Sequence, residues 1–177
     1  KGNIVHIYEK EEEVGFHQSG RNSGVLHCGL AYKPGSLKAQ LAVSGIKQMI
    51  KYCKDYNVSH DICGKIVVAN NENEIDLLDD TAKRGKLNGL KGLKYLNKNE
   101  LKEREPFVSS LKTLLVPEEG IVDYKGVMLS MKENIINNGG DVFLNKKIEK
   151  IEEKKKKIFI NNNSSISYNN IIYTTGL

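Results

Sequence analysis

The segment Ile4-Val5-His6-Ile7-Tyr8-Glu9 is the strongest sign of the fold class of this chain. β-Branched and aromatic residues dominate it, so it predicts a short strand that ends on an acidic side chain. In dinucleotide-binding folds, a carboxylate at the end of such a strand accepts hydrogen bonds from the adenosine ribose hydroxyls. The glycine turn G-x-G-x-x-G that accompanies this strand is absent from the sequence, and we expect it upstream of Lys1.

Helical and β patterns alternate along the rest of the chain. Ser36 can cap a helix whose apolar positions from Leu41 to Cys53 recur at spacings of three and four, and further helices are predicted after Asn71, after Asn97 and after Asp123. Strands are predicted at 63–69, 111–116, 147–152, 158–161 and 166–168, with the Lys154–Lys157 run as a solvated hairpin tip. This order indicates an α/β or α+β domain.

Charge and composition exclude several classes of protein. The 177 residues carry a formal net charge of +5 with a pI near 9.0, but the lysines are interleaved with glutamates and only three arginines are present, so we expect no nucleic-acid partner. The three cysteines, Cys28, Cys53 and Cys63, form no C-x-x-C pair, which argues against a zinc site, a disulfide framework or any other metal centre. They favour a reducing compartment.

The loop from His17 to Gly29, HQSGRNSGVLHCG, is the most unusual stretch of the sequence. Its three glycines permit close approach of a ligand to the backbone, and its hydroxyl, amide, guanidinium and imidazole groups supply donors at close spacing. Such a loop suits a phosphate or a polar heterocycle, while a surface Ω-loop ordered by its Ser and Asn side chains is the alternative.

Several motifs together resemble the L-2-hydroxyglutarate oxidase/dehydrogenase family of FAD-dependent oxidoreductases, within the D-amino-acid-oxidase-like superfamily. They are HQSGRNSGVLHCGLAYKPGSLKAQ, CGKIVVA, RGKLNG, EREP, VPEEGIVDY and IIYTTG, which follow one another over nearly the whole chain. Ala31 departs from the family pattern, which commonly has an aromatic residue before Tyr32. The resemblance implies an incomplete Rossmann-like FAD-binding domain with part of a β-sheet substrate domain, cut at both ends.

The resemblance also implies roles for individual residues. Residues 1–45 would belong to the FAD-binding domain, residues 46–122 mainly to the substrate domain, and residues 123–177 to a return into the FAD-binding domain with a β-meander. Tyr32 and Lys33 would lie on the substrate side. The positions implied to bind FAD are Glu9, Lys10, Ser19, Arg21, Asn22, Ser23, Gly24, Ile148, Thr174, Thr175 and Gly176.

The implied reaction is oxidation of a secondary alcohol next to a carboxylate, with hydride transfer to the flavin and proton transfer to a base. His27 is the candidate base, since histidine accepts a proton near neutral pH. A purely structural role and covalent attachment of the flavin are its two alternatives. His17 is better explained as a residue that orders its loop, and Asp123 as a helix cap.

The predicted function is oxidation of L-2-hydroxyglutarate, a small 2-hydroxy dicarboxylate, to 2-oxoglutarate, with oxygen or a membrane quinone as electron acceptor. Oxidation of glycerol 3-phosphate or of an amine such as glycine is one alternative, and an inactive remnant or non-catalytic module is another. No apolar run reaches the length of a membrane span and no signal-peptide pattern is present, so we expect a cytoplasmic protein, with peripheral association at the inner membrane left open.

Overall fold

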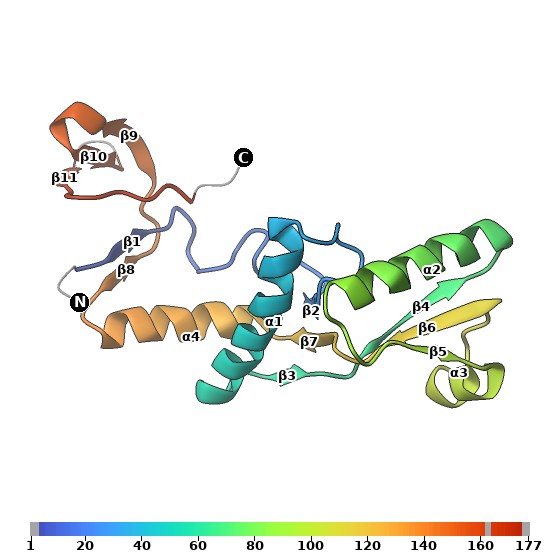
Figure 1. Cartoon of the computed structure of the whole chain (residues 1–177). Helices are drawn as coiled ribbons and strands as arrows, with labels where there is room; N and C mark the ends of the chain where they lie inside the picture. The colour runs from blue at the N-terminus through green and yellow to red at the C-terminus, as the bar shows by residue number, and fades with distance from the viewer. Residues whose placement is uncertain (1–3, 162–163, 175–177) are drawn as a thin grey trace. The chain divides into compact units, whose positions relative to one another are not determined.

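A computed structural model describes residues 4–161 and 164–174 of the chain (Figure 1). It divides into two compact units. The terminal unit comprises Lys1–Arg21 with Tyr124–Leu177, and the central unit comprises Asn22–Asp123. The assignment of residues 1–45, 46–122 and 123–177 to cofactor and substrate domains stays a prediction. Among the described residues, no helix is both long and apolar enough to cross a membrane.

The terminal unit pairs two strands that are far apart in the sequence. Strand β1 (His6–Tyr8) lies parallel to β8 (Asp141–Phe143), with Tyr8 opposite Phe143. The two aromatic rings stack at 5.0 Å between centroids. Because parallel strands need a long crossover, this sheet forms only when residues 124–143 fold back beside the start of the chain.

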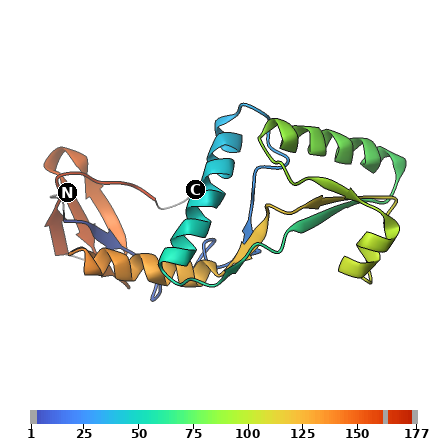
Figure 2. The same cartoon turned by 60° about the horizontal axis from the view of Figure 1, so that its bottom comes forward.

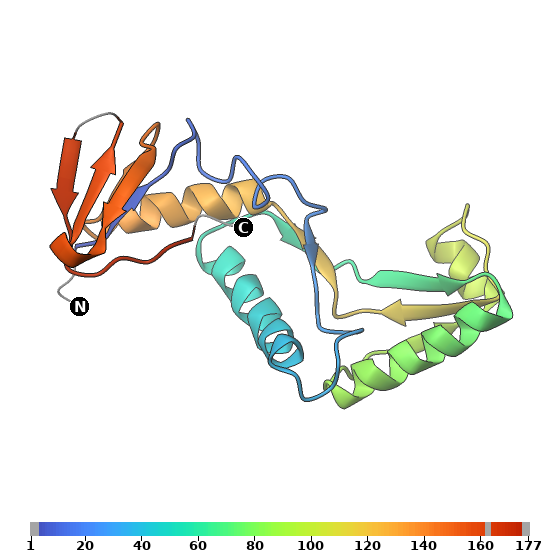
Figure 3. The ribbon, with the colours of Figure 1, turned by 90° about the horizontal axis from the view of Figure 1, so that it is seen from above.

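Helix α4 (Tyr124–Asn137) leads into β8 within the same unit. It stops at Gly139-Gly140, and Gly139 has φ +83°, the left-handed backbone that glycine adopts without strain. The meander that follows has the strand order β11-β10-β9 (Figure 3). Its elements are β9 (Ile148–Glu152), the 3₁₀ turn η1 (Glu153–Lys155), β10 (Lys157–Ile160) and β11 (Ser164–Ser167).

The central unit contains two antiparallel sheets. One has the order β2-β7-β3, and the other has the order β4-β6-β5. Their strands are β2 (Val25–Leu26), β3 (His60–Asp61), β4 (Lys65–Ala69), β5 (Lys94–Leu96), β6 (Lys112–Val116) and β7 (Gly120–Val122). The chain passes directly from β6 in one sheet to β7 in the other, so both sheets meet at residues 117–119.

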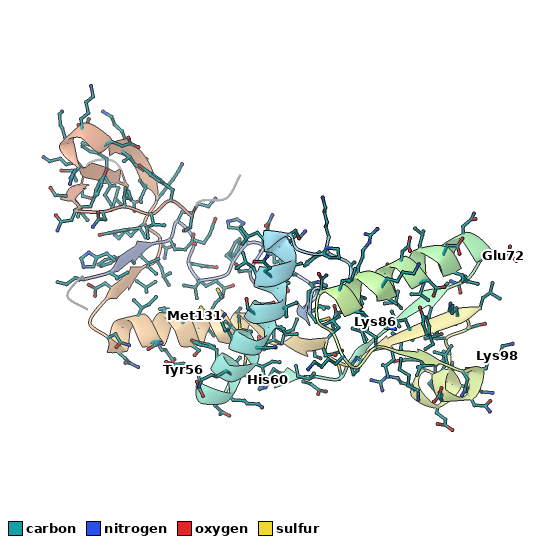
Figure 4. All side chains as sticks on the ribbon, viewed as in Figure 1. Tyr56, His60, Glu72, Lys86, Lys98 and Met131 are labelled. Atoms are coloured by element: carbon teal, nitrogen blue, oxygen red, sulfur yellow. The ribbon has the colours of Figure 1, made fainter. Side chains whose placement is uncertain are left out.

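Three helices complete the central unit: α1 (Leu37–Asp55), α2 (Glu72–Leu87) and α3 (Lys98–Arg104). Helix α2 runs along the β4-β6-β5 sheet (Figure 2) and buries Leu78 and Ala82. Glu72 in its first turn and Lys86 in its last turn point into solvent (Figure 4), where their charges complement the helix dipole.

The predicted helix starts are confirmed. Ser36 Oγ accepts the Ala39 N–H at 3.2 Å, and Asn97 with Glu100 forms a complete capping box. The buried stripe of α1 is narrower than predicted, because it consists of Ala39, Ile46 and Cys53, while Leu41 is exposed. Leu41 lies two residues beyond Ala39, which is about 200° around the helix axis.

Candidate functional site

Strand pairing in the central unit sets His27 beside Glu119. In the β2-β7 pair Leu26 is opposite Gly120, so the next residues along the two antiparallel chains are His27 and Glu119. The Gly64 N–H donates to the Glu119 carbonyl at 2.8 Å, which aligns the beginning of β4 with the same point. Three segments that are remote in the sequence therefore converge on Glu119.

Gly120 is required for this convergence. A Cβ atom at Gly120 would lie 2.3 Å from the Asp61 carbonyl oxygen and 2.9 Å from Ile62 Cα. Both contacts are with backbone atoms that cannot rotate away, so β3 packs closely against β7 only when position 120 is glycine.

The Glu119 side chain is only 2% exposed and has a cationic partner. Its Oε2 forms an ion pair with Lys65 Nζ at the start of β4. On its other side, Cys28 Sγ donates to Oε1 at 3.5 Å, and His27 Nδ1 lies 3.7 Å from the same oxygen. The His27 side chain is 55% exposed, so the imidazole joins a buried carboxylate to the protein surface.

The environment of Cys28 shows how strongly this interior disfavours another negative charge. Burial, together with the neighbouring charge of Glu119, raises the pKa of the Cys28 thiol to about 12. Cys28 is therefore a protonated hydrogen-bond donor and not a nucleophile. The arrangement provides one surface imidazole backed by a buried carboxylate, which suits acceptance and release of a proton.

Sequence reasoning did not single out Glu119. It lies within the VPEEGIVDY segment, directly after the apolar end of β6 and before Gly120. An acid enclosed between two apolar strands is a recognisable signal for a buried, partnered carboxylate. Its partners, however, come from β4 and from the end of β2, and only the tertiary structure brings them together.

The predicted substrate-side residues Tyr32 and Lys33 lie in the loop before α1. Asn88, at the end of α2, holds this loop through two hydrogen bonds from its Nδ2, to the Gly29 carbonyl at 2.8 Å and to the Tyr32 carbonyl at 2.9 Å. Lys38 Nζ lies 4.5 Å from the centre of the Tyr32 ring. Lys33 is exposed, and its carbonyl accepts the Ser36 hydroxyl at 2.6 Å. Their role in substrate binding stays a prediction.

The predicted cofactor residues Asn22, Ser23 and Gly24 form a tight turn in the central unit, just before β2. Asn22 Oδ1 accepts the Gly24 N–H at 2.8 Å, and Gly24 has φ +71°. Gly24 also accepts the Val122 N–H at 2.8 Å, which fixes the turn against the end of β7. The Ser23 side chain is exposed.

In the terminal unit, the structure brings together the residues predicted to surround the adenosine. Glu9 follows β1, and its carbonyl accepts the Lys146 N–H at 2.8 Å, two residues before Ile148 opens β9. Glu9 Oε1 accepts the Glu11 N–H at 3.0 Å, which orients the carboxylate. An oriented carboxylate at the end of a parallel strand, beside the half-buried Ile148, fits the hydroxyls and flat base of an adenosine. Lys10 is exposed and pairs with Glu11.

The loop after Glu9 is ordered by its own side chains. His17 Nε2 lies 2.8 Å from Glu11 Oε1, and this hydrogen bond is the main reason that the pKa of Glu11 is lowered. The guanidinium of Arg21 lies 4.5 Å from the Phe16 ring centre, and the Ser19 side chain is exposed. These observations support the interpretation of His17 as a loop-ordering residue. They leave Arg21 at the surface as an available cation.

The predicted turn at the end of the chain is only partly described. Thr174 is exposed and lies in a segment without regular structure, next to Tyr173, whose hydroxyl donates to Glu153 at 3.0 Å. Thr175 and Gly176, the other two residues predicted in this turn, lie outside the described residues.

Comparison with known protein families identifies the class. The family model of the FAD-dependent oxidoreductases (DAO) matches residues 1–177, and the chain belongs to this family. It is 41% identical over 174 residues to the L-2-hydroxyglutarate dehydrogenase of Indibacter alkaliphilus. The matched region covers 98% of this chain and 44% of that protein. It is 38% identical to the mitochondrial L-2-hydroxyglutarate dehydrogenase of Homo sapiens. That match covers 86% of this chain and 33% of the human protein. The chain thus spans less than half the length of these curated relatives.

Solved structures confirm the fold. The FAD-bound L-α-glycerophosphate oxidase of Mycoplasma pneumoniae superposes with a TM-score of 0.79 at 22% identity, over 90% of this chain and 44% of that one. Glycine oxidase of Geobacillus kaustophilus superposes with a TM-score of 0.72 at 17% identity, over 93% and 46% of the two chains. The predicted mixed α/β fold of the D-amino-acid-oxidase type is therefore confirmed.

Proposed function

We propose that the protein is an FAD-dependent enzyme that oxidises L-2-hydroxyglutarate to 2-oxoglutarate. The observation that carries this proposal is the 41% identity to the L-2-hydroxyglutarate dehydrogenase of Indibacter alkaliphilus over 98% of the chain. The surface imidazole of His27, backed by the buried Glu119, supplies the proton acceptor that alcohol oxidation needs.

The FAD contacts that we propose are those implied by the family resemblance. In the terminal unit, Glu9 would accept hydrogen bonds from the ribose, with Ile148 and Lys10 beside the adenine and with Ser19 and Arg21 near the pyrophosphate. The Asn22–Gly24 turn before β2 would meet the pyrophosphate and the inner edge of the flavin, and Thr174 to Gly176 would close over the cofactor. The orientation of the Glu9 carboxylate by the Glu11 N–H supports the first of these roles.

FAD, when bound, supplies the acceptor for the hydride that leaves the substrate carbon. His27 accepts the hydroxyl proton at Nε2, so that the carbon–oxygen single bond becomes a carbonyl as the hydride departs. Tyr32 and Lys33 orient the substrate, with the ammonium of Lys33 attracting one of its carboxylates. The final acceptor of the electrons is oxygen or a membrane quinone, and the enzyme works in the cytoplasm, where it can meet the inner membrane surface.

The first experiment tests cofactor binding. Titration of the purified protein with FAD should give stoichiometric binding with a changed flavin spectrum, and Glu9→Gln should weaken binding about tenfold, since one charge-assisted hydrogen bond is worth about 1.5 kcal/mol. Glu12→Gln, which changes an exposed neighbouring carboxylate, is the matched control and should bind as the parent does. Failure of the parent protein to bind FAD would contradict the proposal.

The second experiment tests substrate and base. Dye-linked turnover should respond to L-2-hydroxyglutarate, and His27→Asn should lower kcat by about 100-fold or more, as expected for loss of a general base. His60→Asn, a change at the histidine of β3, should leave kcat near the parent value. A response to glycerol 3-phosphate or glycine alone would overturn the choice of substrate.

A further inference from the structure

We propose that Glu119 is the positioning residue for His27: its carboxylate holds the imidazole with the proton on Nδ1, so that Nε2 is free to take the substrate proton. This inference rests on the proposed function of His27 as base. It assigns a role to the most deeply buried carboxylate described in the central unit, whose side chain is only 2% exposed.

The geometry selects one ring nitrogen. Nδ1 is the imidazole nitrogen that faces Glu119, and it lies 3.7 Å from Oε1. This is an ion-pair separation and exceeds hydrogen-bond length, so the carboxylate acts through its charge. A negative charge on the Nδ1 side favours a proton on Nδ1, and Nε2 is left as the basic nitrogen.

The cluster keeps that negative charge in place. Lys65 supplies the countercharge on Oε2, and Cys28 donates to Oε1, so the carboxylate is bound from two sides. Glu118, the neighbouring acid, uses its Oε1 to accept the Lys91 and Gly92 N–H groups at 2.8 and 2.7 Å. Glu119 is therefore the acid that lies beside the His27 ring.

The same charge assists the reaction after proton transfer. When Nε2 takes the hydroxyl proton, the ring becomes an imidazolium with a buried carboxylate 3.7 Å away. Attraction between these opposite charges stabilises the protonated ring, and burial of the carboxylate shields its end of the pair from water. Glu119 touches neither substrate nor cofactor in this scheme, so it acts through His27.

The chain contains its own spectroscopic references for the test. His60 Nδ1 lies 2.9 Å from the Val58 carbonyl, which can only accept, so the neutral His60 ring carries its proton on Nδ1. His17 Nε2 lies 2.8 Å from Glu11 Oε1, so the neutral His17 ring carries its proton on Nε2. The two tautomers are thus represented by two assigned rings in one protein.

The experiment is long-range ¹H–¹⁵N NMR of the histidine-labelled chain at pH ~8.5, where free imidazole is neutral. We expect the ¹⁵N pattern of His27 to match that of His60 and to differ from that of His17. Glu119→Gln should abolish this preference and give His27 a mixed pattern, while His60 and His17 keep theirs. Lys83→Met, which removes one lysine from an exposed ion pair on helix α2 and leaves the Glu119–Lys65 pair in place, should leave the Nδ1–H pattern of His27 intact.

The spectrum of the wild-type chain tests the proposal even if Glu119→Gln does not fold. A His17-type pattern for His27 in the wild-type chain would overturn the proposal, as would a His60-type pattern that persists in Glu119→Gln. In the FAD-loaded enzyme, Glu119→Gln should lower kcat about tenfold with little change in KM. Because the NMR readout needs neither FAD nor substrate, it stands or falls separately from the proposed function.

Discussion

Two carboxylates, Glu119 in the central unit and Glu152 in the terminal unit, are both held by lysines but in different surroundings. Glu119 is 2% exposed, with one lysine partner at its Oε2. Glu152 ends β9 with its side chain 21% exposed, and it has Lys150 Nζ at 2.6 Å and Lys155 Nζ at 3.0 Å. Glu152 therefore has more lysine partners than Glu119, although its side chain is the more exposed of the two. We therefore expect burial, and not the number of cations, to decide how strongly the stability of the protein depends on each carboxylate–lysine pair.

Removal of the lysine from the buried pair should have the largest effect. Lys65→Met leaves Glu119 buried without its countercharge, and the free energy of unfolding should fall by about 3 kcal/mol, the low end for a buried pair because Lys65 is partly exposed. Urea denaturation followed by circular dichroism measures this loss. The double variant Lys65→Met/Glu119→Gln should recover part of the lost stability, and a double variant no more stable than Lys65→Met would refute the buried-charge explanation.

Thiol reactivity tests the burial of the same cluster. Cys28 and Cys53 are buried and Cys63 is exposed, and burial is the main cause of the raised pKa at both Cys28 and Cys53. Alkylation at pH ~8 should modify Cys63 at least ~100-fold faster than Cys28. Peptide mass spectrometry over a time course measures the rates. In Glu119→Gln, Cys28 should stay slow, because burial outweighs the Glu119 charge; rapid alkylation of Cys28 there would contradict this ranking.

Asp79 is a third carboxylate held by a lysine, and its side chain is more exposed than those of Glu119 and Glu152. It accepts hydrogen bonds from Lys112 at 2.6 and 2.8 Å and from the Tyr95 hydroxyl at 2.5 Å, with its side chain 34% exposed. Lys112→Met should lower the free energy of unfolding by less than Lys65→Met does. Lys83→Met, which removes an exposed partner of Asp80 on the same helix, is the control and should have the smaller effect of the two. A larger loss of stability in Lys83→Met than in Lys112→Met would contradict this ranking.

The smallest expected effect is at Glu152. Hydrogen bonds from Lys150 and Lys155 lower the pKa of Glu152 to about 2. Its contribution to stability is therefore present above the ordinary glutamate pKa of 4.5 and is lost as pH falls through about 2. A ¹³C NMR titration of its carboxyl carbon should show this low midpoint, and Lys150→Met should move it upward. Lys154→Met, a change in the adjacent turn η1, should leave the midpoint in place.

Local signals predicted much of the fold. Ser36 and Asn97 mark helix starts through hydrogen bonds to N–H groups within three residues, and Gly139 marks a helix end, so these features follow from nearby sequence. Strands β2 and β3 were not predicted, because each has two residues and exists only through pairing with the distant β7. His60 lies in β3, opposite Val122 of β7.

The candidate site was predictable only in part. The motif that contains His27 pointed to that residue, and the acid after β1 pointed to Glu9. Glu119 could not be selected, because its partners Lys65 and Cys28 are 54 and 91 positions away in the sequence, and their approach depends on two sheets meeting at residues 117–119. Burial of a charged side chain is a tertiary property, so its functional meaning emerges only with the fold.

The most direct test of the central claim is anaerobic mixing of the FAD-loaded protein with each candidate substrate. We expect L-2-hydroxyglutarate to bleach the flavin absorbance near its long-wavelength maximum, with release of one 2-oxoglutarate per flavin, and His27→Asn to slow the bleaching by about 100-fold or more. Glycerol 3-phosphate and glycine should leave the spectrum unchanged. Bleaching by either of these with none by L-2-hydroxyglutarate would contradict the account.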